Sequence, residues 1–168
     1  MSTRLATVDD SAAIARIYNE GIEDRVATFE TRLRTPGEVA AWFDGIHPIV
    51  VVEREGEVVA FASTSSYSER ECYSGVAEFN VYVARHHRGE GAGREAMEVL
   101  FPTAEAAGYW KVLSRVFVEN VASRALLAAV GLREVGVYER HARLDGQWRD
   151  VVIVERLLGE AAQPRDEA

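Results

Sequence analysis

The sequence has few of the residues that cross-link a fold or anchor it in a membrane. Its 168 residues include a single cysteine, Cys72, which excludes an internal disulfide and any multi-cysteine metal site. No apolar run reaches the roughly 20 residues of a membrane-spanning helix. Met1 to Arg4 lead into the first predicted strand without a signal-peptide core. These absences predict a cytoplasmic protein with no membrane partner.

Basic residues are also scarce, with 19 Lys and Arg against 27 Asp and Glu and a net charge of −8. Nucleic acid is therefore not expected as a partner, because phosphate backbones bind basic surfaces. A metal is not expected either, because it needs three or four converging ligands. His86 and His87 are adjacent and point different ways, and His141 lies far along the chain.

What is present is an ordinary globular composition, with 48% hydrophobic residues. It predicts one domain at 1–158 and a polar, flexible tail at 159–168. Hydrophobic periodicity predicts strands at 3–7, 49–52, 58–63, 76–84, 112–118, 135–144 and 151–158, the last two joined by a turn at Asp145-Gly146.

The helical spacing of apolar residues predicts helices at 12–22, at a short stretch opened by Thr35-Pro36, at 91–107 and at 120–130. Asp9 or Asp10 is the expected N-cap of the first helix, and Pro102 predicts a kink or an early break. The segment 65–75 is expected to be irregular. The fold class is therefore α/β of the mixed α+β type, with one mixed sheet and helices on both faces.

The strand at 76–84 and the glycine-rich loop after it carry the most chemical information. Glu78 alternates with apolar side chains, so one acidic group lies on the polar face of the strand together with Tyr82. In the loop, alternating glycines lie between Arg88 and Arg94. Such a loop at a helix N-terminus presents backbone N–H groups and predicts a pyrophosphate site, with the arginines as added charges. A plain glycine-rich turn is the alternative.

Three classes of phosphate-binding loop compete for this segment. A P-loop needs Lys and then Ser or Thr after its last glycine, but Gly93 precedes Arg94 and Glu95. A dinucleotide fingerprint matches 91–96 in form, yet it needs an acidic residue about 20 positions later, and 109–118 contains none. The coenzyme A pattern, Arg or Gln followed by x-x-Gly-x-Gly or Ala, fits 88–93 in full.

The segment 76–94, with Asn120-Val121-Ala122-Ser123 and Gly131-Leu132, resembles the GNAT superfamily of acetyl-CoA-dependent N-acetyltransferases. Within it, the sequence is most similar to the phosphinothricin N-acetyltransferase group. That likeness covers nearly the whole chain up to Leu158. It rests on Ile17-Tyr18-Asn19, Ala27-Thr28-Phe29-Glu30, Trp42-Phe43, Arg70 with Tyr73, Glu78, Val81-Tyr82-Val83 and Gly146-x-Trp148-x-Asp150.

The resemblance implies a central, mostly antiparallel sheet with a splayed strand pair, and acetyl-CoA as co-substrate. The pantetheine arm would pair with the exposed strand backbone, and the loop would hold the pyrophosphate. The implied cofactor contacts are Val81, Tyr82, Val83, Arg88, Gly89, Glu90, Gly91, Ala92, Gly93, Arg94, Asn120 and Ser123. A helix N-cap is the alternative for Asn120, and a surface position is the alternative for Ser123.

For catalysis the resemblance implies Glu78 as the base that takes a proton from the acceptor amine, directly or through water. An ordinary solvent-facing strand residue is the alternative. Asn120 is implied as a second catalytic residue, and a backbone N–H near Val81 would polarise the thioester oxygen. Leu127 occupies the position where the family has a Tyr or His as general acid, so no general acid is assigned.

The implied acceptor is the primary amine of a small amino-acid-like substrate of the phosphinothricin or methionine-derivative type. Arg70 and Tyr73 match positions near which related enzymes hold a substrate carboxylate or phosphinate, and Phe29 and Glu30 are expected to line the other wall. A packing or surface position is the alternative for each. A protein or peptide N-acetyltransferase and a non-catalytic acyl-CoA sensor are the alternatives. Similar enzymes are commonly dimers, so a homodimer through the hairpin at 145–146 is expected.

Overall fold

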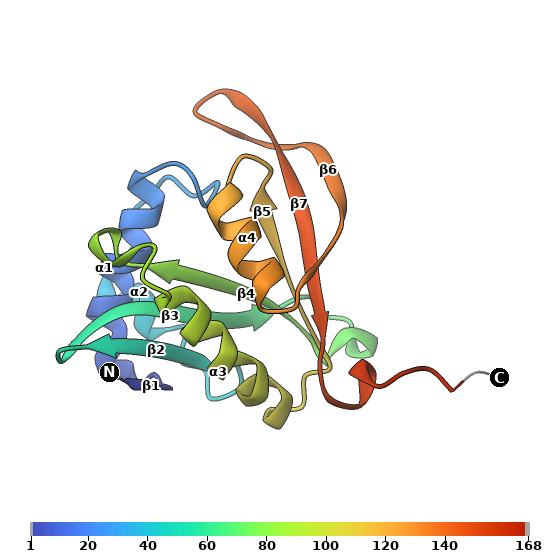
Figure 1. The fold of residues 1–168 in the computed structure, drawn as a ribbon. Helices are drawn as coiled ribbons and strands as arrows, with labels where there is room; N and C mark the ends of the chain where they lie inside the picture. The colour runs from blue at the N-terminus through green and yellow to red at the C-terminus, as the bar shows by residue number, and fades with distance from the viewer. Residues whose placement is uncertain (1, 167–168) are drawn as a thin grey trace.

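Seven strands of the described residues, 2–166, form one sheet in this computed structural model (Figure 1). The order across the sheet is β1-β2-β3-β4-β5-β7-β6, and all neighbours are antiparallel except β4 and β5, which are parallel. The strands are β1 (Ser2–Leu5), β2 (Ile49–Arg54), β3 (Glu57–Ser66), β4 (Val76–Val83), β5 (Lys111–Phe117), β6 (Arg133–Leu144) and β7 (Gln147–Leu157). The predicted mixed, mostly antiparallel sheet is confirmed.

Helices cover both faces of this sheet, as predicted. They are α1 (Ser11–Glu23), α2 (Pro36–Ala40), α3 (Ala92–Ala106) and α4 (Val121–Ala129). Single 3-10 turns occur at η1 (Val8–Asp10), η2 (Glu71–Tyr73), η3 (Arg85–His87) and η4 (Gly159–Ala162). α1 and α2 pack on one face, α3 and α4 pack on the other, and the β6–β7 hairpin projects beyond the rest of the sheet (Figure 1).

Alternation along the central strands explains why both faces bury helices. On β2, Val50 packs in the core under α3, whereas Val51 packs in the core under α1 and α2. On β3, Ala60 likewise packs under α3, and Phe61 packs under α1 and α2. A strand that is buried on both faces needs apolar residues at every position, and this accounts for the continuous apolar run at 49–52.

β4 and β5 lie side by side over only three residue pairs. Val76 to Glu78 pair with Lys111 to Leu113, and beyond these pairs the two strands separate. On its other side, β4 stays paired with β3 as far as Val83. The half of β4 beyond Glu78 therefore has a free backbone edge, which is the splayed arrangement that the resemblance implies.

The predicted order of elements is confirmed, and the differences are local. α3 continues through Pro102 to Ala106, so the predicted early break is wrong. Its neighbours Leu100 and Phe101 are buried in the core, and this packing holds the helix together across the proline. Residues 65 and 66 belong to β3, and the rest of the segment predicted as irregular contains η2.

Three further predictions concern the start of the first helix, the last hairpin turn and the C-terminal tail. Asp10 is the N-cap residue of α1, as predicted, but its carboxylate accepts the N–H of Thr7 (2.8 Å) and pairs with Arg4 (2.9 Å) instead of bonding to that helix. The hairpin turn is the predicted one, with φ of 49° at Asp145 and 78° at Gly146, the type I′ geometry. Of the predicted tail, 159–162 form η4, and residues 167–168 lie outside the described residues.

Candidate active site

The outer half of β4 presents backbone groups toward the side that β5 has left. Ala84 donates its N–H to the carbonyl oxygen of Val59 (2.7 Å), and this fixes which residues of β4 bond to β3. Because the direction alternates along an antiparallel strand, the backbone groups of Val81 and Val83 point away from β3. The carbonyl oxygen of Val83 accordingly accepts a hydrogen bond from Nε of Arg88 (3.3 Å). An extended ligand can pair with this edge as an added strand would.

The loop between β4 and α3 has glycine where other residues would be strained or would clash. Gly89 and Gly91 have φ of 81° and 87°, and Gly91 is the N-cap of α3. A Cβ atom on Gly93 would lie 3.0 Å from Cδ2 of Leu126 and 3.3 Å from Cγ2 of Val83. The loop therefore reaches the first N–H groups of α3, at the positive end of its dipole, without side chains at 89, 91 and 93.

Carboxylates hold the arginines on either side of this loop. Nη1 of Arg88 lies 2.6 Å from Oδ2 of Asp24, and Nε of Arg94 lies 2.7 Å from Oε1 of Glu98. Hydrogen bonds from Arg85 and then from Arg88 hold the pKa of Asp24 below its ordinary value. Both pairs are solvent-accessible, so an arriving anion can compete for either guanidinium.

A cleft of about 410 Å³ runs along the free edge of β4 and the glycine loop. Every residue that the sequence predicted to contact the cofactor lines this cleft except Glu90, whose carboxylate lies 3.0 Å from Nδ1 of His87. The sequence did not single out as site residues Gly21, Val26, Ala27, His87, Ala122 and Leu126, which also line it. Most of these belong to α1, the loop after it and α4, whose approach to β4 is a tertiary feature with no local signal.

Asn120 connects two walls of the cleft. Its Oδ1 accepts the N–H of Ser123 (3.2 Å), which confirms the N-cap interpretation of this residue. Its Nδ2 donates to the carbonyl oxygen of Val26 in the loop after α1 (3.1 Å). Both polar groups of the side chain are thus engaged, and they fix the position of α4 relative to that loop.

A small cavity lies between the separated strands and continues from the cleft, with which it shares Tyr82 and Asn120. On the side of β5 it is lined by Ser114 and Arg115, and on the side of α4 by Leu127. Leu127 is 1% exposed and packs in the core under α3. The position at which the resemblance places a general acid is therefore a buried apolar side chain.

Glu78 lies where β4 and β5 separate. Ala77 and Phe79 are packed under α3, so the alternation places Glu78 on the opposite face, which it shares with Tyr82 as predicted. Its Oε1 lies 3.0 Å from Nη1 of Arg115 on β5, and its side chain is 26% exposed. Glu78 also stands directly opposite Ser65 of β3.

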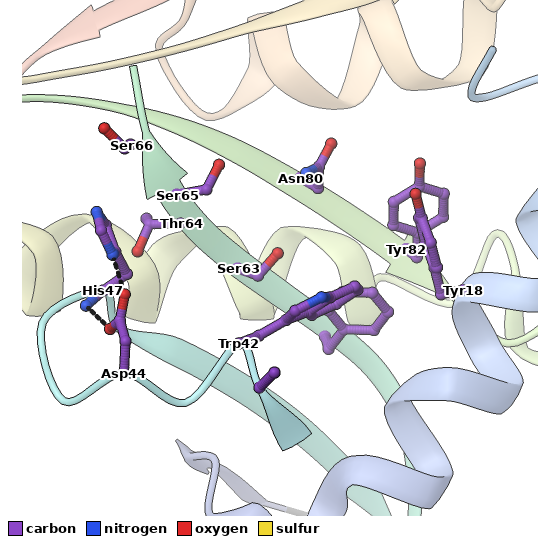
Figure 2. A pocket seen from close by; sticks show the side chains of 12 residues that line it. Tyr18, Trp42, Asp44, His47, Ser63, Thr64, Ser65, Ser66, Asn80 and Tyr82 are labelled. Carbon is purple, nitrogen blue, oxygen red and sulfur yellow. Dashed lines mark hydrogen bonds and ion pairs between the residues drawn. The ribbon is translucent and has the colours of Figure 1, made fainter. Parts of the chain in front are cut away.

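On this face a second pocket, of about 390 Å³, opens between β3, β4 and the segment after α2 (Figure 2). Trp42 and Phe61 form its apolar part. Its polar lining includes the side chains of Tyr18, His47, Ser63, Ser65, Asn80 and Tyr82. Ser65 lines the pocket and stands opposite Glu78 on the neighbouring strand, so the pocket lies one strand away from that residue. The sequence did not predict this pocket as a unit, because its lining comes from elements far apart in the chain.

An aspartate–histidine pair lies at one end of the second pocket. Nδ1 of His47 is 2.5 Å from Oδ2 of Asp44, and the backbone N–H groups of Ile46 and His47 donate to Oδ1 of Asp44 (both 2.8 Å). Burial opposes ionisation, but these hydrogen bonds prevail and lower the pKa of Asp44 to about 2. At the other end, burial raises the pKa of Tyr18 and of Tyr82, so both phenols stay protonated.

The four predicted acceptor contacts lie around these features but line neither hollow. The Phe29 ring packs edge-to-face on Phe117 of β5, with the centroids 4.8 Å apart. Glu30 pairs with Arg34 (2.8 Å). The guanidinium of Arg70 lies over the ring of Tyr73, 5.5 Å from its centroid.

Within residues 2–166, no three His, Cys, Asp or Glu side chains gather as metal ligands would. Over the same residues, no helix combines the length and the apolar character that crossing a membrane requires.

In comparisons with known proteins, the matching family model and the relatives described here are all acyltransferases. The model of the acetyltransferase (GNAT) family matches residues 14–132. The chain is 31% identical to a phosphinothricin N-acetyltransferase from Streptomyces viridochromogenes, over 96% of this chain and 90% of the relative. It is 27% identical to the L-amino acid N-acyltransferase MnaT of Escherichia coli, over 98% of both chains.

A solved structure extends the likeness to three dimensions. The crystal structure of a GNAT superfamily phosphinothricin acetyltransferase from Sinorhizobium meliloti, in complex with acetyl-CoA, superposes with a TM-score of 0.88. The two chains are 27% identical, and the match covers 99% of this chain and 92% of the other. That protein was therefore solved with the ligand for which the sequence of this chain predicts a site.

Proposed function

The chain belongs to the acetyltransferase (GNAT) family, and on that premise we propose that it transfers the acetyl group of acetyl-CoA to the primary amine of a small amino-acid-like substrate. One observation carries the proposal: the cleft continues into the cavity between β4 and β5. Arg115 lines this cavity and contacts the carboxylate of Glu78. Relatives named for phosphinothricin and L-amino acid acylation support the acceptor class.

On the cofactor side, the pantetheine arm would pair with the outward backbone groups of Val81 and Val83. The pyrophosphate would lie against the first N–H groups of α3, beside Gly93, where a Cβ atom would already be crowded. Arg88 and Arg94 would exchange their present carboxylate partners for phosphate oxygens, which arginine binds with two parallel hydrogen bonds.

The acetyl thioester supplies the electrophile, and the protein supplies a base and an oxyanion contact. The carboxylate of Glu78 takes a proton from the acceptor ammonium, so that the neutral nitrogen can attack the thioester carbon. The outward N–H of Val81 donates to the carbonyl oxygen as negative charge develops there. As the C–S bond breaks and the amide forms, the nitrogen releases its second proton to solvent. The thiolate takes a proton from solvent, because Leu127 cannot donate one; a thiol pKa of about 8.5 makes this departure feasible.

Asn120 and Ser123 are proposed to contact the cofactor from α4, with Asn120 holding the cleft wall in its catalytic position. This role differs from proton transfer, because both polar groups of Asn120 are already engaged. We expect an Asn120→Ala variant to weaken cofactor binding and turnover together.

The acceptor is proposed to approach from the face of α1 and α2, where the second pocket includes Ser65, the residue opposite Glu78. Phe29 lines neither hollow in the free protein, but its ring on Phe117 would bound a substrate held at Glu78 on the side of β5. Glu30 lies near enough to Tyr18 to help raise its pKa, after burial, and would form the wall beside α1. Arg70 and Tyr73, just before β4, would meet a distal anionic group of the substrate.

Assembly as a cytoplasmic homodimer completes the proposal. The β6–β7 hairpin leaves several large apolar side chains exposed, namely Val135 (47%), Val137 (52%), Tyr138 (52%) and Trp148 (52%). A second copy of the chain would cover them. Sedimentation at micromolar concentration should show a dimer, and a monomer under those conditions would contradict this part of the proposal.

The function is tested by incubating the protein with acetyl-CoA and a panel of primary amines while following release of free thiol. The panel comprises phosphinothricin, methionine sulfone, methionine sulfoximine, common amino acids and a short peptide. We expect turnover with amino acids and little with the peptide. Acetyl-CoA binding without transfer to any of these amines would contradict the enzyme and favour the acyl-CoA sensor, which the buried Leu127 makes the second candidate.

A further inference from the structure

One ion pair spans the point at which β4 and β5 separate. Glu78 stands opposite Leu113 in the last backbone pair, and Arg115 lies two residues further along β5 on the same face. The guanidinium reaches back to the carboxylate at 3.0 Å. Backbone pairing already joins the strands at this level, and an exposed ion pair adds about 1 kcal/mol at most. Stability alone is therefore a weak reason for an arginine here.

The surroundings of Arg115 point to a ligand. Its side chain is 42% exposed, so a small molecule can reach it, and it also lines the cavity between the strands. Two residues further along, Phe117 and the ring of Phe29 form an apolar surface on the same face. Arg115 thus lies between the proposed base, the small cavity that continues from the cleft, and an apolar wall.

We infer that Glu78 and Arg115 form a receptor for the zwitterionic end of an α-amino acid, with Arg115 selecting substrates that carry a free α-carboxylate. This inference rests on the proposed function and names a specificity residue for it. In the free protein, the two side chains neutralise each other. The substrate replaces this internal pair with two new ones, its ammonium on Glu78 and its carboxylate on Arg115.

Chemistry favours this exchange. The ammonium and carboxylate of an α-amino acid are attached to one carbon, so a single molecule can contact two groups that are themselves only 3.0 Å apart. Arginine binds carboxylates through two parallel hydrogen bonds, so it fixes orientation as well as charge. The same exchange removes the cation from Glu78 as the amine arrives, and the carboxylate is then free to take the proton.

A second cation on this face has to be considered. Arg149 of β7 lies with its guanidinium 5.6 Å from the centre of the Phe117 ring, and its buried Nε has no hydrogen-bond partner among residues 2–166. Its nearest carboxylate is that of Glu119, at 3.7 Å. Arg115 is the stronger candidate for the α-carboxylate because it contacts Glu78 directly.

The experiment compares L-methionine sulfone with its α-carboxamide, which keeps the amine and removes the negative charge. Arg115→Gln should lower kcat/KM for the acid by about 10- to 100-fold, mainly through KM, and change the carboxamide by no more than about threefold. The kcat/KM of Arg115→Lys for the acid should lie between that of the wild type and that of Arg115→Gln. Arg133→Gln is the matched control, because Arg133 also pairs with a carboxylate across two strands (Glu155, 2.9 Å) but lies away from the cleft.

Binding of the acid in the presence of CoA, followed by calorimetry, separates this inference from the proposed function. Loss of binding in Arg115→Gln supports the receptor even if the wild type transfers no acetyl group. Equal losses for acid and carboxamide would make Arg115 merely structural and overturn the inference. So would an unchanged preference for the acid in Arg115→Gln, or a preference lost only in Arg149→Gln. Wild-type protein that acetylates the carboxamide but neither binds nor acetylates the acid would overturn the receptor and leave acetyl transfer standing.

Discussion

The cleft proposed for the cofactor and the side of the sheet proposed for the acceptor are built in different ways. The cleft presents backbone groups from one contiguous stretch of chain: the outward groups of Val81 and Val83, the glycines at 89 and 91, and the first turn of α3. The acceptor side is made of side chains that converge from α1, the segment after α2, β3, β4 and β5.

This difference determines how each region responds to amino-acid substitution. A backbone site keeps its hydrogen-bond geometry when most of its side chains change, so it suits a cofactor that many enzymes share. A site made of side chains changes its ligand with a single substitution, so it suits a substrate that distinguishes one enzyme from the next. Variants in the two regions should therefore fail in different ways.

Glu78→Gln should have the largest effect. The amide keeps the shape of the side chain but cannot take a proton, so kcat should fall by about 10²- to 10⁴-fold. The affinity for acetyl-CoA should stay unchanged, because the cleft does not include this residue. The loss should shrink as the pH rises, because more of the amine is then neutral without a base. Steady-state rates and calorimetry across pH 7 to 10 measure both parts.

Glu134→Gln is the matched control for this variant. Glu134 also lies on a strand and pairs with an arginine, Arg124, at 2.8 Å, but it lies outside the cleft. The kcat of Glu134→Gln should equal that of the wild type. If Glu78→Gln keeps full activity at neutral pH, the base lies elsewhere, and Glu30 is the next residue to test.

Gly91→Asp should have the next largest effect and should act on the other region. A ligand that binds only the native state at 100 times its Kd stabilises by about 2.7 kcal/mol, which corresponds to a rise in Tm of about 5 to 10 °C for a chain of this size. The new carboxylate would repel the pyrophosphate, so acetyl-CoA should no longer raise Tm. Gly56→Asp controls for backbone strain, since Gly56 has a similar φ (79° against 87°) and lies outside the cleft. A normal acetyl-CoA shift in Gly91→Asp would refute the assignment of the loop.

The same difference in construction decided what the sequence could predict. The glycine loop is contiguous, and its residues 88–93 match the coenzyme A pattern, so the residues that the sequence predicts as cofactor contacts nearly all line one cleft. Only Glu90 lies outside it, turned toward His87. The sheet was predicted because an alternating or continuous apolar run is a local signal of a strand, and the separation of β4 from β5 was predicted from the family resemblance.

The acceptor side left no comparable signal. Arg115 lies in a short strand, and its sequence context is that of an ordinary surface cation. Its position near Glu78 depends on the register between β4 and β5, which is set by the pairs from Val76 to Glu78. Phe29 was expected to line a pocket, but its ring is taken up by Phe117. The second pocket joins Tyr18 to Asn80 across more than sixty positions of sequence, and no local pattern reports such a contact.

Asp44→Asn should have the smallest effect and should act on the acceptor side alone. The amide oxygen can still accept the N–H groups of Ile46 and His47, but the charge that holds the imidazole is lost. At pH 7, Tm should fall by about 2 to 4 °C, and KM for the acceptor should rise by about threefold. KM for acetyl-CoA should stay unchanged.

The pH dependence distinguishes a role of the charge at position 44 from a change in packing. The pKa of Asp44 is about 2 in the folded protein, below its ordinary value of 3.8. A depressed carboxyl pKa stabilises the fold above the unfolded value, and this stabilisation disappears as the pH falls through the folded value. The Tm difference between wild type and Asp44→Asn should therefore be constant from pH 7 down to about 4 and close toward about pH 2. A difference that stays constant to pH 2 would show that the variant acts through packing and not through the carboxylate.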